Sequence, residues 1–214
     1  MIKFETYEDV KVEEVIDESK PFIDKEGKMH ITLDSSVKCI FDPKFDNGNH
    51  VVSGELSKII KENKVYVLNR VLDYCPGYGS MGLDMLASGV TNHVVFVDME
   101  ESPVFSCLET SKNNSILFHT TGYAIDSIDD LPQEEKYDVV VATMQGDDKK
   151  YEDFFAHIYK YLTIYADIYL IEPKDNPKLK KSDDIKFQNV YYVKSFPLNG
   201  KMIMHYKLSH SHLK

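Results

Sequence analysis

From residue 65 to residue 172 the chain alternates between short apolar strand patterns and amphipathic helix patterns. Strands that alternate with helices are typical of a parallel sheet whose two faces are covered by helices. The clearest strand pattern is a continuous β-branched run at 137–143, as a central strand buried on both faces requires. The expected strands are 65–73, 93–98, 116–121, 137–143 and 166–172, and the expected helices between them are 81–87, 102–113 and 150–162. This alternation restricts the fold to the α/β class.

The C-terminal part of the chain departs from the alternation. Two β-branched and aromatic runs, 187–196 and 202–208, follow one another with no helix pattern between them. The segment 197–200 supplies a turn that ends in Asn-Gly. These runs predict a terminal antiparallel hairpin.

The N-terminal part contains two short strand patterns, 29–33 and 36–41, and a helix pattern at 53–62 that Ser53 is expected to cap. We therefore expect a Rossmann-like, doubly wound sheet of about seven strands, mostly parallel with a C-terminal antiparallel hairpin, and a small N-terminal β-rich lead-in. The predicted division is an extension at 1–50 and a principal domain at 51–214.

Composition and charge restrict the class of protein and its partners. Hydrophobic residues make up 43% and charged residues 28%, which is ordinary soluble usage, and no apolar run reaches the roughly 20 residues of a membrane span. A formal net charge of -10 disfavours nucleic acid as a partner, because duplex binding depends on clustered Lys and Arg. The N-terminus lacks the apolar core of a secretory signal, and the three cysteines are widely spaced. We expect a cytoplasmic protein with reduced thiols and no metal site.

The turn that follows Asp73 carries most of the functional information. After that acid comes a G-x-G-x-x-G pattern, Gly77, Gly79 and Gly82, which opens a helix. Glycines let a backbone approach a ligand closely, and a helix N-terminus offers unpaired N–H groups. Asp98 ends the next strand about 20 residues later, where a carboxylate can accept hydrogen bonds from both hydroxyls of a ribose. The pattern predicts a nucleotide-like ligand.

The acid at position 73 helps to decide between two classes of nucleotide-binding enzyme. In dinucleotide-binding dehydrogenases the apolar strand usually continues to the first glycine, whose neighbours admit a pyrophosphate. Asp73 stands four residues before Gly77, and its carboxylate would repel a pyrophosphate but attract the ammonium group of an amino acid. This favours S-adenosyl-L-methionine as the cofactor, with an NAD-type dehydrogenase as the alternative.

At these residues the chain resembles the class I S-adenosylmethionine-dependent methyltransferases, whose first motif runs from a strand through an acid to G-x-G and whose fold ends in a reversed hairpin. The resemblance covers roughly residues 50–208. The segment 45–50 is similar to a glycine-containing loop with a His in ribosomal-protein methyltransferases, and 98–113 is similar to their acid-to-Asn helix. The chain thus resembles the branch that includes release-factor and ribosomal-protein methyltransferases.

The resemblance implies which residues bind S-adenosyl-L-methionine. Asp73, Gly77 and Gly79 would hold the methionine part, while Gly82 would allow close helix packing. Asp98 would bind the ribose. The complete predicted set is Asp73, Gly77, Tyr78, Gly79, Gly82, Asp98, Met99, Tyr123, Ala124 and Asp126.

The adenine end of this predicted site departs from the family pattern. Met99 follows the ribose acid and would pack on the adenine. Where the family often has Gly-Asp-Ala, this chain has Tyr123 between Gly122 and Ala124, so the acid that reaches the adenine amino group is replaced. Asp126 is the expected substitute.

The acceptor end departs as well. Many amide and amine methyltransferases of this branch carry Asn-Pro-Pro-Tyr after the fourth strand, whereas this chain has Thr-Met-Gln-Gly at 143–146. Thr143 and Gln145 are therefore the candidate catalytic residues, because they offer polar groups where the nucleophile would lie. We expect methyl transfer to an O or N nucleophile, with a protein side chain preferred over a small molecule. A catalytically degenerate cofactor-binding module is the non-enzymatic alternative.

Overall fold

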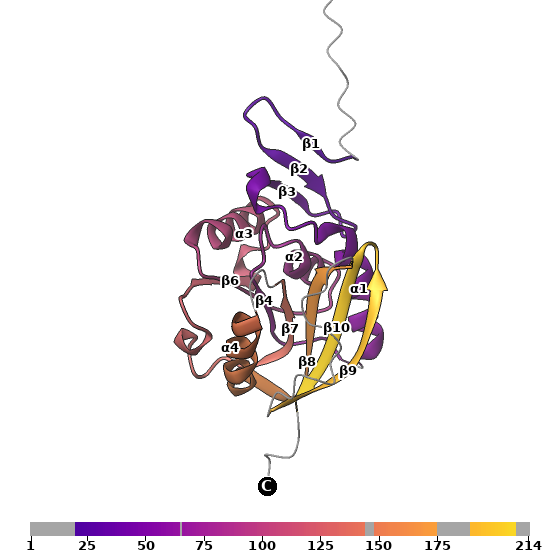
Figure 1. The fold of residues 1–214 in the computed structure, drawn as a ribbon. Helices are drawn as coiled ribbons and strands as arrows, with labels where there is room; N and C mark the ends of the chain where they lie inside the picture. The colour runs from indigo at the N-terminus through magenta and orange to yellow at the C-terminus, as the bar shows by residue number, and fades with distance from the viewer. Residues whose placement is uncertain (1–19, 65, 144–147, 175–188, 209–214) are drawn as a thin grey trace, which may run out of the picture.

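The predicted α/β sheet is present in a computed structural model of the chain, which describes residues 20–64, 66–143, 148–174 and 189–208 (Figure 1). The strands of the main sheet are β4 (Val71–Tyr74), β5 (Val94–Asp98), β6 (Thr120–Ala124), β7 (Tyr137–Ala142), β8 (Leu162–Pro173), β9 (Val190–Leu198) and β10 (Lys201–Leu208). Their order across the seven-stranded sheet is β6-β5-β4-β7-β8-β10-β9. The first five strands are parallel, and β10 pairs antiparallel with β8 and β9. The predicted fold, including its C-terminal hairpin, is confirmed.

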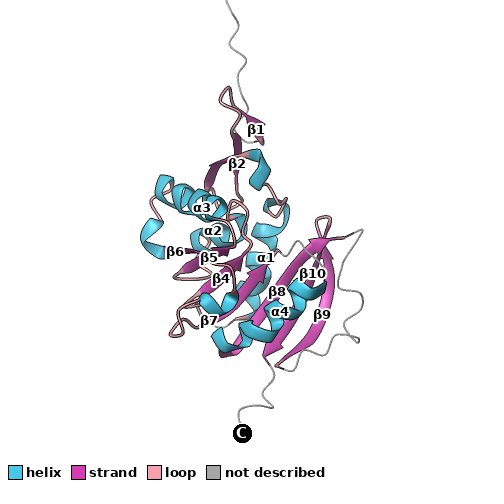
Figure 2. Cartoon of the chain, turned by 60° about the vertical axis from the view of Figure 1, so that its left-hand side comes forward, coloured by secondary structure: helices cyan, strands magenta, loops and turns pink. Residues whose placement is uncertain are grey.

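Helices cover both faces of this sheet (Figure 2). On one face lie α1 (His50–Asn63), α2 (Ser80–Ala87) and α3 (Glu101–Asn113), and on the other lies α4 (Asp148–Ile158). Successive side chains of a strand point to opposite faces, so Val139 and Val141 pack in the core of the first three helices, while Val140 and Ala142 pack in the core of α4. Burial on both faces explains the continuous apolar run of β7.

A separate three-stranded antiparallel sheet stands at the N-terminal end (Figure 1). It consists of β1 (Phe22–Ile23), β2 (Met29–Thr32) and β3 (Lys38–Phe41). Its apolar side chains do not form a core of their own, because Ile31 and Phe41 belong to the same buried cluster as α1 and α2. The ring of Phe41 stacks on that of Tyr78 with centroids 3.7 Å apart. The division of the chain at residue 50 stays a prediction.

The third predicted strand was placed wrongly. The apolar run at 116–119 ends in a 3-10 turn, Leu117–His119, and Phe118 is 96% exposed. Strand β6 begins only at Thr120, where parallel pairing with β5 aligns Ala124 with Asp98. Apolar residues at an exposed turn imitate a strand pattern, and only pairing with the neighbouring strand sets the register.

The start of α1 and the hairpin turn also differ from expectation. The helix begins at His50 with Asn49 as its N-cap, and Ser53 lies inside it, where its hydroxyl donates to the carbonyl of His50 at 3.2 Å. The turn was predicted at 197–200, but β9 continues to Leu198, so only Asn199 and Gly200 form the turn. Their φ angles of 42° and 82° suit a two-residue hairpin turn. The fourth predicted helix ends at Ile158 and is followed by a 3-10 turn, Tyr159–Tyr161.

Among the described residues, no helix combines the length and the apolar character that crossing a membrane requires.

The contact between Phe41 and Tyr78 generates a stability prediction. Phe41 is 2% exposed, so Phe41→Ala leaves a cavity in the shared core and should lower the free energy of unfolding by about 3–5 kcal/mol. Urea unfolding followed by circular dichroism measures the change. Phe118→Ala is the matched control and should change the free energy by less than about 0.5 kcal/mol, because Phe118 is 96% exposed. Equal stability of the two variants would contradict a shared core.

Candidate functional site

The order of the strands identifies one edge of the sheet as the place for a site. From β4 the chain adds β5 and β6 on one side, then returns to place β7 against the other side of β4. In open α/β sheets ligands bind outside the carboxyl ends of the strands, at the point where the strand order reverses. Asp73 in β4, Asp98 at the end of β5 and Thr143 directly after β7 all lie at this edge.

Asp73 is the most unusual group at this edge. It is 0% exposed, and its Oδ2 accepts a hydrogen bond of 2.9 Å from the backbone N–H of Gly82. Its Oδ1 is buried and has no hydrogen-bond partner within the described part of the chain. Burial raises the pKa of Asp73 to about 7, and the negative charge of Asp98 adds to the rise, whereas the Gly82 bond opposes it. Within the described residues, the fold therefore holds a buried carboxyl group that lacks a partner for one oxygen.

Close packing determines the backbone conformation of the turn after β4. Cys75, Gly77 and Gly79 all have positive φ, at 54°, 62° and 86°. A Cβ atom on Gly77 would come within 2.5 Å of the carbonyl oxygen of Phe45, and one on Gly79 within 2.8 Å of the Sγ of Cys107. The turn is thus pressed against a neighbouring loop on one side and against α3 on the other. Only glycine fits these two positions without displacing backbone or core.

Gly82 has a different role, since it lies in the first turn of α2. A Cβ atom there would lie 2.5 Å from Val94 Cγ1 and 3.1 Å from the Oδ2 of Asp73. Because Gly82 has no Cβ atom, α2 approaches β5 closely enough for the Gly82 N–H to reach the Asp73 carboxylate. This agrees with the close helix packing expected for Gly82.

The loop before α1 covers the glycine turn. Asn47 donates through Nδ2 to the carbonyl of Pro76 at 3.1 Å. Asn49 is 1% exposed, its Nδ2 donates to Thr143 Oγ1, and its Oδ1 is a buried acceptor with no partner among the described residues. The loop at 45–50 was singled out from the sequence, but Asn49 was not. The available signal was its position, one residue before His50 in that loop.

Two predicted adenine residues lie together in one cavity. Met99 and Asp126 line a cavity of about 520 Å³ with Tyr74, the last residue of β4, and Cys75, the residue after it. Met99 is 50% exposed and so is available to a ligand. Lys150, at the start of α4, contributes a positive charge to the same cavity, and no sequence pattern singled it out. The cavity adjoins the end of β4 and is large enough for a small ligand.

Asp98 is half-buried at the end of β5, and its Oδ1 accepts from the Glu100 N–H at 3.1 Å. Burial raises the pKa of this carboxyl, the N–H bonds of Glu100 and Met99 oppose the rise, and the charge of Lys150 lowers it as well. A carboxylate at this strand end, one strand away from Asp73, has the placement that ribose binding requires.

Of the predicted residues that the structure describes, only Met99 and Asp126 line this cavity. Tyr78 has no exposed surface and stacks on Phe41, so it touches no ligand in this conformation. Tyr123 is partly buried against the core on the α4 side. Ala124 lines a different cavity, and Gln145 lies outside the described residues.

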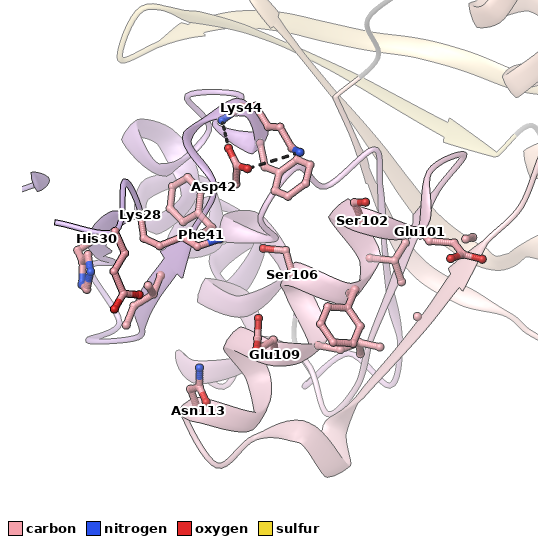
Figure 3. A pocket seen from close by; sticks show the side chains of 18 of the residues that line it. Lys28, His30, Phe41, Asp42, Lys44, Glu101, Ser102, Ser106, Glu109 and Asn113 are labelled. Atoms are coloured by element: carbon pink, nitrogen blue, oxygen red, sulfur yellow. Dashed lines mark hydrogen bonds and ion pairs between the residues drawn. The ribbon is translucent and has the colours of Figure 1, made fainter. Parts of the chain in front are cut away.

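That second cavity lies between the N-terminal sheet and α3 (Figure 3). It has a volume of about 970 Å³. Lys28, His30 and Phe41 border it on one side, and Glu109 and Asn113 of α3 border it on the other. Neither cavity is lined by Asp73 or Asp98. The second cavity is the larger, but it runs along α3 and contains neither Met99 nor Asp126, whereas the first cavity includes Tyr74, the neighbour of Asp73 in β4.

No protein-family model and no curated protein matches the chain. Among solved structures, the chain is similar to a ribosomal protein L11 methylase from Lactobacillus delbrueckii subsp. bulgaricus, with a TM-score of 0.61 and 17% identity over 79% of this chain and 84% of that one. It is similar to P. horikoshii TYW2 in complex with MeSAdo, with a TM-score of 0.65 and 15% identity over 86% and 72% of the two chains.

A third similar structure is the N-methyltransferase NodS from Bradyrhizobium japonicum WM9 in complex with S-adenosyl-L-homocysteine, with a TM-score of 0.59 and 11% identity over 77% of this chain and 90% of that one. The chain therefore has the fold of the class I methyltransferases that it resembles in sequence.

The buried carboxyl of Asp73 predicts a specific pH dependence. Its pKa is about 7 in the folded protein and about 4 in an unfolded chain, so between these values the folded state binds the extra proton. The free energy of unfolding should therefore fall as pH rises from about 4 to about 7, by up to about 4 kcal/mol from this group. Asp73→Asn should remove that part of the fall in urea titrations at successive pH values.

The matched control for Asp73→Asn is Glu62→Gln, which removes a carboxylate from an exposed position at the end of α1. Its pH profile should follow the wild-type profile. If Asp73→Asn also follows the wild-type profile, the Asp73 carboxyl is not perturbed by burial.

Proposed function

We propose that the chain is an S-adenosylmethionine-dependent methyltransferase that binds its cofactor across the carboxyl ends of β4 and β5. The observation that carries the proposal is Asp73, which the Gly82 N–H holds at the reversal of the strand order, while Oδ1 has no partner among the described residues. Asp98 on the adjacent strand supplies the second carboxylate. The likeness in fold to structures in complex with MeSAdo and S-adenosyl-L-homocysteine supports it further.

The chemistry of these groups fits S-adenosylmethionine better than a dinucleotide. The Oδ1 of Asp73 would lie close to the cationic amino-acid part, where an ammonium group favours the ionised carboxylate. Asp98 would accept hydrogen bonds from the two ribose hydroxyls. A pyrophosphate beside Asp73 would instead place like charges together. The NAD-type dehydrogenase is therefore the weaker proposal.

The adenine would enter the cavity lined by Met99 and Asp126. The thioether side chain of Met99 offers an apolar, polarizable contact for a flat ring, and Asp126 offers an acceptor for an exocyclic amino group. Asp126 thereby takes the part that the family gives to the residue at Tyr123, whose ring packs against the core.

Bound S-adenosylmethionine would supply an electrophilic methyl group on a sulfonium. The residues of the chain would then have to orient an O or N nucleophile in line with it, and positioning alone contributes several kcal/mol. Asn49 offers a buried Oδ1, without a partner in the described part of the chain, that can accept an N–H or O–H of the acceptor, and Thr143 holds the Asn49 amide in place. Gln145 is the further candidate. A protein side chain is the preferred acceptor over a small molecule, and the cytoplasmic setting stays a prediction.

Isothermal titration with S-adenosylhomocysteine and with NADH tests the cofactor. We expect S-adenosylhomocysteine to bind and NADH not to bind, and binding of NADH alone would overturn the proposal. Incubation with radiolabelled S-adenosylmethionine and fractionated lysate then tests transfer. Binding without label in protein, nucleic acid or small molecules would favour the degenerate module.

The ribose carboxylate gives a binding prediction. Asp98→Ala removes the acceptor for two hydroxyls, and hydrogen bonds to a charged group contribute about 1.5–3 kcal/mol. The dissociation constant for S-adenosylhomocysteine should therefore rise at least about tenfold by isothermal titration. Glu62→Ala, at the end of α1, should leave it unchanged. An unaltered constant in Asp98→Ala would remove Asp98 from the site.

Thr143 gives a prediction on turnover. Thr143→Val keeps the shape of the side chain but removes the oxygen that accepts from Asn49 Nδ2. The turnover number should fall at least about tenfold, because the acceptor loses its orientation, while the dissociation constant for S-adenosylhomocysteine stays within about twofold. Thr143→Ser, which retains the hydroxyl, should recover most of the rate. Equal loss in both variants would speak against this role.

A further inference from the structure

A third cavity lies at the opposite edge of the sheet, where the parallel strands begin. It has a volume of about 500 Å³. Its walls come from the end of α1, the first half of β8, and the ends of β9 and β10 that lie away from their turn (Figure 1). None of the residues proposed to bind S-adenosylmethionine lines it.

The charge of this cavity is opposite to that of the chain. Its lining includes Lys64, Lys194 and Lys207, whereas the chain carries a net charge of -10. Asp167 is the one acid in the described lining, and it is already engaged by Lys64 Nζ at 2.6 Å and by His205 Nε2 at 2.7 Å. Lys207 Nζ lies further from it, at 3.7 Å, and its side chain stays 45% exposed. The cavity therefore presents positive charge to a ligand.

Aromatic rings form much of the remaining wall. Tyr66 and Tyr191 are each 48% exposed and Tyr165 is 73% exposed, so the three rings present accessible surface at the cavity. Deeper in the wall, Tyr169 stacks on His205 with centroids 4.6 Å apart and an interplanar angle of 9°. Flat, accessible rings beside ammonium groups suit a ligand that carries both an aromatic ring and an anionic group.

His205 adds a buried polar atom to this wall. The residue is 7% exposed and its Nε2 is fixed by Asp167, yet its Nδ1 has no hydrogen-bond partner in the described part of the chain. A buried imidazole nitrogen without a partner carries a desolvation cost that a polar ligand group can offset. The same cavity thus combines positive charge, exposed rings and a buried polar atom that has no partner among the described residues.

We propose that this cavity binds a nucleotide unit, with Lys194 and Lys207 contacting the phosphate and the base stacking on the tyrosine rings. Its volume falls within the range of about 300–1,000 Å³ that is usual for small-molecule sites. Stacking accepts any base, so the site binds without sequence preference. The proposal is independent of the proposed methyltransferase activity, because it uses no residue of that site.

The unit can come from a free nucleotide or from a single strand, and two titrations of the full chain distinguish these sources. Isothermal titration with AMP measures the free nucleotide. Fluorescence anisotropy with a labelled ten-residue oligouridylate measures the single strand at several salt concentrations. Lys194→Ala/Lys207→Ala should weaken binding at least about tenfold and should lower the salt slope of the oligonucleotide by about 0.7 for each lysine that contacts a phosphate.

Tyr165→Ala/Tyr191→Ala removes the exposed rings and should also weaken binding at least about tenfold, with the salt slope unchanged. Lys112→Ala and Phe118→Ala are the matched controls, since both side chains are exposed elsewhere on the surface, and neither should change the affinity. Thermal unfolding checks that each variant folds, and Lys194→Ala alone replaces the double lysine variant if that one does not.

Binding of AMP, of the oligonucleotide or of both, weakened by the cavity variants and not by the controls, supports the proposal and identifies the source. Absence of binding to either probe overturns it, as does binding that the cavity variants leave unchanged. Displacement of the nucleotide by a ten-residue polyglutamate at equal concentration overturns it too, because the site would then recognise an acidic peptide. Titration with S-adenosylhomocysteine should give the same affinity in all variants, so failure of this proposal and of the methyltransferase proposal are separable.

Discussion

The hydrogen bond between the Gly82 N–H and the Asp73 carboxylate joins the end of β4 to the first turn of α2, and the geometry of the candidate site depends on it. It fixes where the glycine turn begins and ends. The carboxyl group is wholly buried and one of its oxygens has no partner within the described ranges, which is costly when the group is ionised. A cationic ligand near Asp73 would offset this cost. The fold therefore carries a local instability in the place where a ligand can relieve it, a common feature of functional sites.

The N-terminal residues take part in this geometry and do more than extend the chain. The carbonyl of Phe45 lies so close to Gly77 that no Cβ atom fits between them, and Phe41 of β3 stacks on the ring of Tyr78. Asn49 bridges from the same region to Thr143 at the end of β7. The glycine turn thus packs between the loop before α1, which contacts Gly77, and the core residues Phe96 and Cys107, which contact Gly79. A ligand at the carboxyl edge would meet groups from both sides of residue 50.

Local patterns in the sequence predicted most of the fold, because strand and helix periodicities report burial directly. The run at 137–143 became the doubly buried strand β7, and the terminal runs became the β9–β10 hairpin. The third strand was misplaced because Leu117 and Phe118 are apolar yet exposed, and exposure depends on the tertiary structure.

The site residues fall into the same two groups: those that a local motif predicts and those that only the tertiary structure brings to the site. Asp73, Gly77 and Asp98 follow from a motif with fixed spacing, and the structure places them at one edge of the sheet. Asn49 and Lys150 approach that edge from elements outside the glycine motif, so the spacing of that motif does not identify them. The place of Asn49 before His50 was a signal in the loop, whereas no pattern pointed to Lys150. Tyr78 shows the opposite error, since a residue between two motif glycines has its ring in the core.

The topology also distributes charge between the two edges of the sheet. Helices that follow parallel strands begin at the carboxyl edge and end at the amino edge, so the positive ends of α2 and α3 lie near Asp73 and Asp98. The helix α1 ends at the amino edge, where Lys64 is its C-cap residue and contacts Asp167. Asp73 and Asp98 thus lie at the edge where the helix dipoles favour anions, and Lys64 lies at the edge where they favour cations. For this reason the net charge of -10, which disfavours nucleic acid for the chain as a whole, does not describe the cavity at the amino edge.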